Sequence, residues 1–138
     1  MYDILNLLFV YLLEKDIKNI YIENVKEADL YNYTLHILSL GDVENIQTFY
    51  DNEESESKIV TVELEVYDTD RKNLIKSVKE LKKIFKNMRI TGTKEELKHL
   101  DVESAYLENE IYDREIVKKD IIEYRAILVF NLFVNEKI

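Results

Sequence analysis

The chain has 138 residues, of which 46% are hydrophobic and 34% charged, and its formal net charge is −9. This length and hydrophobic content predict one folded domain, residues 1–138, rather than two domains or a disordered chain. The acidic balance disfavours binding to nucleic-acid phosphates. Because the chain has no Cys, it carries no disulfide, thiolate metal site or thiol nucleophile.

The first segment, "MYDILNLLFVYLLEKD", predicts a helix over residues 2–15 because its apolar residues recur at helical spacing. The apolar run covers only about a dozen residues, which is too short to cross a bilayer. Asp3 stands where a signal peptide carries Lys or Arg. We therefore expect a buried helix whose second apolar side faces the core or another subunit, and no contact with a membrane.

Two β-branched and tyrosine-rich runs, "IKNIYIENV" and "LYNYTLHILSL", predict strands over residues 18–25 and 30–40. The following segment, 41–58, ends in the acidic, serine-bearing tract 51–57. That composition predicts a solvated loop or a hairpin tip.

The clearest pattern lies at the centre of the chain. Val60, Val62, Leu64 and Val66 alternate with polar residues, which predicts a strand with one buried and one exposed face. Apolar residues then recur at helical spacing over residues 71–85, with lysines on the outer face. The side chains that can cap this helix are Asp68, Thr69 and Asp70.

The last third of the chain predicts a short helical turn near residues 93–100, a strand over 102–113, a charged tip at 114–120 and a strand over 121–136. The final strand is apolar on both faces, so it is central or covered on its second face. The sequence therefore predicts the α+β class: a mainly antiparallel sheet packed with an N-terminal helix and a central amphipathic helix, in the order α-β-β-β-α-β-β.

No pattern in the chain indicates chemistry. His36 and His99 are the only histidines, and no second ligand or carboxylate stands at a suitable offset from either. The acidic clusters lie in polar surroundings rather than beside apolar residues that would raise a carboxyl pKa. The "DTD" of residues 68–70 lacks the Gly and distal Glu of a calcium loop. We therefore expect a protein that is not an enzyme and has no catalytic, cofactor or metal site.

Several segments, in their order along residues 2–136, resemble one protein family. They are the apolar first helix, "YNYTLHIL" with the acidic loop, "VTVELEVYDTDRKNLIKSVKELKKIF", the acidic "ENEIYDRE" and the final "YRAILVFNLFVNE". In this order they resemble the tail terminator (tail completion) proteins of long-tailed bacteriophages and of phage-tail-like particles. The chain departs from this family in lacking Pro and Trp and in its acidic 51–57 loop.

The resemblance implies a virion structural protein that forms a homo-oligomeric ring, typically of six subunits, at the head-proximal end of the tail tube. Such a ring contacts the tail tube protein, stops tube polymerisation and docks the neck (head-completion, or stopper) protein. In a contractile tail it also meets the sheath protein. Genomic DNA passes through the ring without specific binding. The implied location is the head–tail junction of the virion, after assembly in the host cytoplasm.

Tyrosine and other large aromatic residues are favoured in interfaces because they bury a large area. On this basis we expect subunit contacts at Tyr2, Phe9, Tyr11, Tyr67, Tyr112 and Phe133. We expect partner contacts in the acidic loop and the charged tip, at Asp51, Asn52, Glu53, Glu54, Glu56, Arg114, Glu115, Lys118 and Lys119. The alternative is a small dimeric ligand-binding or regulatory module, which would show polar groups converging in an apolar pocket.

Overall fold

The computed structural model describes residues 2–23, 34–46, 55–92 and 99–137. These ranges contain two helices and six strands. In chain order they are α1 (Tyr2–Glu14), β1 (Ile20–Ile22), β2 (Leu35–Ile46), β3 (Ser55–Asp68), α2 (Arg71–Lys86), β4 (Ile90–Thr91), β5 (Leu100–Lys118) and β6 (Ile121–Lys137).

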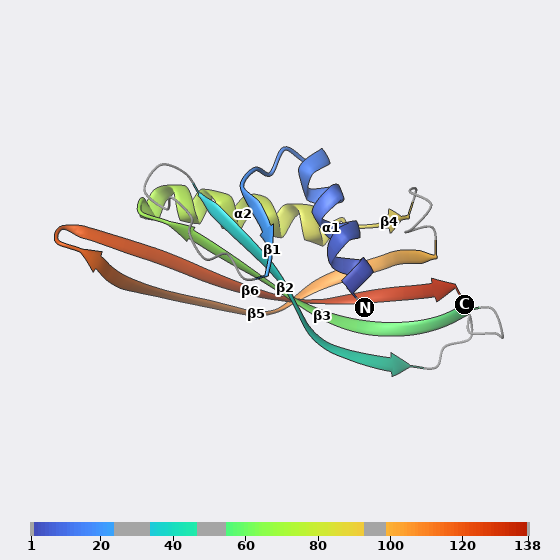
Figure 1. Cartoon of the computed structure of the whole chain (residues 1–138). Helices are drawn as coiled ribbons and strands as arrows, with labels where there is room; N and C mark the ends of the chain where they lie inside the picture. Colours follow the sequence, from blue (N-terminus) through green and yellow to red (C-terminus); the bar gives the residue numbers. More distant parts are fainter. Residues whose placement is uncertain (1, 24–33, 47–54, 93–98, 138) are drawn as a thin grey trace.

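The six strands form one curled sheet in the order β1-β2-β3-β6-β5-β4. Neighbouring strands are antiparallel except β1 and β2, which run parallel. Figure 1 shows that both helices lie on the same face of this sheet. We call that face the inner face and the opposite one, which neither helix covers, the outer face.

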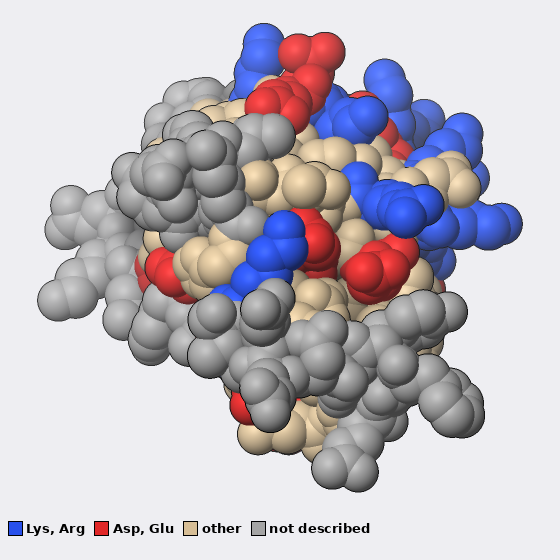
Figure 2. Space-filling model, turned by 90° about the vertical axis from the view of Figure 1, so that its right-hand side faces the viewer, with Lys and Arg blue, Asp and Glu red and all other residues tan. Residues whose placement is uncertain are grey.

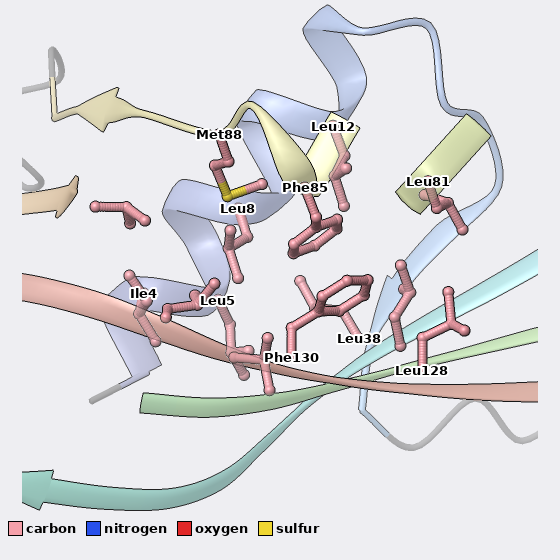
Figure 3. Packing of buried hydrophobic residues seen from close by; sticks show 14 of the residues in the cluster. Ile4, Leu5, Leu8, Leu12, Leu38, Leu81, Phe85, Met88, Leu128 and Phe130 are labelled. Atoms are coloured by element: carbon pink, nitrogen blue, oxygen red, sulfur yellow. The ribbon is translucent and has the colours of Figure 1, made fainter. Parts of the chain in front are cut away.

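The hydrophobic core fills the space between the helices and the inner face. Alternate residues of β3 and β6 point into it, and α1 and α2 cover them with their apolar sides (Figure 3). The rings of Phe85 and Phe130 stack at the centre, with centroids 3.9 Å apart and an angle of 10° between their planes. Burying each such side chain fully contributes about 1.5–3 kcal/mol.

The central strand-to-helix corner confirms the sequence pattern. Val60, Val62, Leu64 and Val66 are all buried on the inner face of β3. The predicted helix over residues 71–85 is α2, which begins at Arg71 and ends one residue later than expected. The final strand is central, as its two apolar faces indicated, because β6 lies between β3 and β5.

The predicted α+β class, with the order α-β-β-β-α-β-β, is wrong. Strands make up 60% of the structure and helices 25%, so the fold is mostly sheet. The sheet is mixed, since β1 pairs parallel with β2, and the short β4 adds a strand between α2 and β5. β4 has only two residues, too few to show a period of alternation, so the sequence pattern missed this strand. Alternation carries no information on strand direction, so it could not indicate the parallel pairing either.

Several strands are also longer than their patterns indicated. The segments read as loop or tip at 41–46, 55–57 and 114–118 belong to β2, β3 and β5. Their polar residues hid the strands, because a strand paired with a neighbour is held by backbone hydrogen bonds and needs no apolar face of its own. Most of the helical turn predicted near residues 93–100 and parts of the first two predicted strands lie outside the described residues, and Leu100 begins β5.

Candidate interaction surfaces

The most prominent feature of the molecule is the long hairpin of β5 and β6. Figure 1 shows that it extends past the N-terminal end of α2, so its distal end is not covered by a helix. Near this end the strands pair Tyr112 with Ala126, Arg114 with Tyr124, and Glu115 with Glu123. Directly paired residues share a face of the sheet and successive residues alternate between faces. The buried Ala126 therefore assigns Tyr112, Arg114 and Tyr124 to the inner face.

A groove with a volume of about 640 Å³ lies between this part of the hairpin and the first turns of α2. Apolar side chains remain partly exposed in it: Ile75 is 37% and Tyr112 50% exposed. The groove therefore combines aromatic and aliphatic surface with two guanidinium groups. Its lining residues are Arg71, Leu74, Ile75, Tyr112, Asp113, Arg114 and Tyr124.

The start of α2, and with it one wall of the groove, is held by two aspartates. The Asp70 carboxylate accepts hydrogen bonds from the backbone N–H groups of Lys72 (2.9 Å) and Asn73 (3.4 Å), which makes it the N-cap. The buried Asp68 carboxylate accepts from the Asp70 backbone N–H (2.7 Å) and from the Thr34 hydroxyl (2.5 Å). These bonds fix the first turn of α2 against the end of β3.

The opposite wall is tied to α2 by an ion pair. Lys82 Nζ lies 2.5 Å from Glu110 Oε2, and the Tyr112 hydroxyl donates a hydrogen bond to the same carboxylate. Burial raises the pKa of Glu110, but the hydrogen bonds from Lys82 and Tyr112 outweigh it, and the pKa lies below its usual range. Burial and the bond to Glu110 together raise the pKa of Tyr112 to about 12.

A smaller hollow of about 280 Å³ lies at the other end of α2. It has an almost entirely apolar surface formed by residues of α2, β5 and β6. Its lining residues are Lys82, Phe85, Lys86, Ala105, Tyr106, Leu107 and Phe130.

The outer face of the hairpin is acidic. Arg125 makes a two-point ion pair with Asp113, which lies directly opposite it on β5. The hydrogen bond from Arg125 lowers the pKa of Asp113, and the same bond, followed by one with Tyr67, raises the pKa of Arg125. Next to this pair, Glu115 lies directly opposite Glu123. Burial and then the Glu115 charge raise the pKa of Glu123.

Towards the middle of the sheet, polar side chains on the outer face bond to one another. The Tyr67 hydroxyl donates to Glu65 Oε2 at 2.5 Å. Burial, followed by that bond, raises the pKa of Tyr67 to about 12. Asn131 accepts a hydrogen bond from the Thr61 hydroxyl (2.8 Å) and donates to the Tyr106 hydroxyl (3.2 Å). These bonds satisfy polar groups on a face that neither α1 nor α2 covers.

The exposed side of α2 is strongly basic. Lysines recur along it at intervals of three and four residues, which places them on one stripe of the helix surface. Figure 2 shows Lys and Arg side chains gathered at the upper right of the molecule in that view. A chain of net charge −9 therefore separates its charges, with basic groups on α2. The stripe consists of Lys72, Lys76, Lys79, Lys83 and Lys86.

The two histidines occupy different parts of the fold. His36 is buried on β2 and its Nδ1 lies 2.9 Å from the Lys18 carbonyl oxygen, to which it donates; Nε2 has no partner among the described residues. Burial lowers the pKa of His36. His99 is partly exposed beside Asp3, with 3.3 Å between Nε2 and Oδ2. Within the described ranges, no group of three or more His, Asp or Glu side chains could hold a metal ion.

The residues predicted to contact partners fall into two groups. Asp51, Asn52, Glu53 and Glu54 lie outside the described residues, and Glu56 belongs to β3 rather than to a loop. The expected tip at 114–120 is mostly strand, because β5 continues to Lys118 and the turn consists of Lys119 and Asp120. Arg114 lines the groove, whereas Glu115 pairs with Glu123 on the outer face; all three residues also line another hollow of about 300 Å³.

The residues predicted for subunit contacts do not form one surface. Tyr112 lies in the groove, in the interior of β5 rather than at its end, and Tyr67 lies on the outer face. Phe133 is half-buried on the outer face, nearer the other end of β6. Phe9 and Tyr11 are partly buried against the core, and the side chain of Tyr2 lies outside the described part.

Sequence patterns did not identify the groove residues Arg71, Ile75 and Tyr124. Arg71 and Ile75 stand about fifty positions from Tyr124, so no local spacing could join them. The sequence did contain one indication. Ile75 lies next to the buried stripe of Leu74, Val78 and Leu81, and an apolar residue at the edge of such a stripe remains partly exposed beside the core.

No protein-family model matches this chain, and no curated protein matches its sequence at a significant level. Among the described residues, neither helix has the length and apolar character needed to cross a bilayer.

Proposed function

We propose that this protein is a structural subunit that resembles phage tail terminators and acts as a ring, typically of six copies. The ring sits at the head-proximal end of the tail tube, within the virion, where it stops polymerisation of the tube protein. It provides the docking face for the neck protein and, in a contractile tail, for the last ring of sheath protein.

The observation that carries this proposal is that two different surfaces of one subunit remain exposed among the described residues. One is the groove beside α2, with Ile75 and Tyr112 partly exposed, and the other is the outer face of the sheet. A ring of identical subunits requires a heterologous interface, in which one surface of each subunit meets a different surface of the next. Exposed Tyr106, Ile111 and Ile116 add apolar area along β5 that such contacts would bury.

The charge of the chain supports the passage of DNA through such a ring. Proteins bind DNA tightly when their basic groups replace counterions on the phosphates. A subunit with a net charge of −9 lacks this driving force overall. Genomic DNA would therefore move through the ring without being held.

The test is the length of the tails in particles from a host in which this gene has been deleted. Electron microscopy should show overlong tubes without heads, because nothing stops the addition of tube subunits. A plasmid-borne wild-type copy should restore the normal length, which controls for effects on neighbouring genes. Normal tails on filled heads would reject the proposal.

A second candidate, a dimeric binding module, is favoured by the groove itself. Its volume of about 640 Å³ lies within the range of small-molecule sites, and it combines apolar walls with Arg71 and Arg114. The two candidates differ in native mass as the protein concentration rises. A dimer of constant mass at every concentration would favour the binding module, whereas growth to a closed ring would favour the terminator.

A further inference from the structure

The distal end of the β5–β6 hairpin has two faces of opposite chemistry. Its inner face carries Tyr112, Arg114, Ile116 and Tyr124, and Ile116 is 75% exposed. Together with Arg71 of α2, this face is apolar and basic. Within the described ranges, neither Arg71 nor Arg114 forms an ion pair, and their guanidinium groups line the groove together with Asp113.

The outer face of the same hairpin end is acidic. Glu115 and Glu123 occupy directly opposite positions, an arrangement in which two like charges destabilise a sheet. The neighbouring Asp113 is already paired with Arg125 of the same chain. On the same face, Ile111 is 44% exposed. An incoming cation would relieve the repulsion between the two glutamates.

We propose that the outer face of the hairpin in one copy docks into the groove of the next copy, with Glu115 and Glu123 facing Arg71 and Arg114. The two surfaces match in kind, since one offers paired carboxylates beside an exposed isoleucine and the other offers guanidinium groups beside exposed aromatic and aliphatic side chains. Arginine favours such contacts because its planar guanidinium group binds a carboxylate at two points.

This contact is heterologous, because the groove and the acidic face are different surfaces of one chain. Repetition of a heterologous contact gives a closed ring when the rotation closes and a filament when it does not. The inference therefore rests on the proposed function, for which it names the subunit interface. It also explains why the hairpin extends beyond α2: a strand pair covered on both sides could not be shared between two subunits.

Charge reversal tests the contact directly. The groove variant Arg71→Glu/Arg114→Glu and the hairpin variant Glu115→Arg/Glu123→Arg each place like charges against one another. Sedimentation velocity should show self-association at least about tenfold weaker in either variant than in the wild type, since opposed charges at an interface are strongly unfavourable. An equimolar mixture of the two variants should associate again, because each variant then meets a partner of opposite charge on both of its surfaces.

Two further proteins control for net charge and for folding. Lys79→Glu/Lys83→Glu changes the net charge by the same amount as the groove variant but lies on the exposed stripe of α2, so its association should equal that of the wild type. Arg71→Gln, a single change at an exposed position, should weaken association even if the double groove variant fails to fold. Circular dichroism melting would report the folding of each protein.

Three results would overturn the contact. In the first, the groove variant associates as strongly as the wild type. In the second, the equimolar mixture of the two variants does not associate. In the third, the wild-type protein stays monomeric up to about 1 mM, the weak end of measurable affinities. The last result would assign the groove to a different occupant. The deletion phenotype is a separate test. If deletion gives overlong tails and the groove variant, supplied in place of the wild type, restores their normal length, this contact is rejected while the proposed function stands.

Discussion

Lys82 on α2 and Glu110 on β5 form an ion pair, with 2.5 Å between Nζ and Oε2, that lies between the groove at the start of the helix and the smaller hollow at its end. The pair joins the helix to a strand whose hairpin extends past it. It therefore helps to set the distance between the two walls of the groove.

Replacing Lys82 with Met or Glu110 with Gln should lower the free energy of unfolding by about 0.5 kcal/mol, because the lysine is more than a third exposed and solvent screens the charge. A double-mutant cycle measured by urea unfolding should give a coupling energy below about 1 kcal/mol that shrinks in high salt. Since folding lowers the pKa of Glu110, this contribution is present above pH 4.5 and is lost as the pH falls through the folded-state pKa. The exposed Lys83→Met is the matched control, and an equal loss there would contradict a specific pair.

Replacing the N-cap Asp70 with Ala should destabilise the protein by about 1 kcal/mol, because the backbone N–H groups of Lys72 and Asn73 would lose their acceptor. Asp70→Ser should keep most of the stability, since a hydroxyl also caps. Thermal or urea unfolding would measure both. If Asp70→Ala and Asp70→Ser were equally destabilised, the capping interpretation would be wrong.

Truncating Phe85 to Ala should cost about 3–5 kcal/mol, since it removes a fully buried ring that stacks on Phe130 and leaves a cavity in the core. The control on the same helix is Ile75→Ala, whose side chain is partly exposed in the groove and should cost far less. Urea denaturation would give both values. Similar losses at the two positions would show that the core does not depend on the stacked pair.

Acidification should destabilise the protein through His36. Burial lowers its pKa below 6.5 and outweighs the backbone hydrogen bonds with Lys18 and Asn19 and the nearby carboxylates, which act in the opposite direction. The unfolded chain therefore binds a proton that the folded chain does not. The contribution of His36 to stability is therefore constant above pH 6.5 and falls as the pH drops towards the folded-state pKa. An NMR titration of the imidazole should give a midpoint below 6.5, and His36→Gln should remove this part of the pH dependence. A midpoint at or above 6.5 would contradict the expected burial effect.

Tyr67 and Tyr112 should ionise later than an ordinary tyrosine, with pKa values of about 12. A raised folded-state pKa means that their contribution to stability is fully present below pH 10 and is lost as the pH rises through about 12. The ultraviolet absorbance of tyrosinate would follow the ionisation. Tyr67→Phe and Tyr112→Phe should each remove one group that ionises late. A midpoint near pH 10 for these two tyrosines would contradict the raised pKa values.

Local patterns predicted the elements whose signal is strong and near in sequence. The alternation from Val60 to Val66 and the helical spacing that begins at Leu74 are both present in the structure. The same method failed for the extension of β5 to Lys118, because a strand rich in charged residues shows no alternation. Its partner β6 supplies the backbone hydrogen bonds that keep it extended.

The sequence by itself determined the acidic charge, the absence of cysteine chemistry, the buried faces of β3 and β6 and the amphipathic α2, since composition and short periods are properties of neighbouring residues. Only the tertiary structure decided the mixed, mostly-strand sheet, the groove that joins Arg71 to Tyr124, and the placement of Glu115 directly opposite Glu123. These features depend on strand order, register and the twist of the sheet. Contacts between distant segments set all three, and no local pattern in the chain records them.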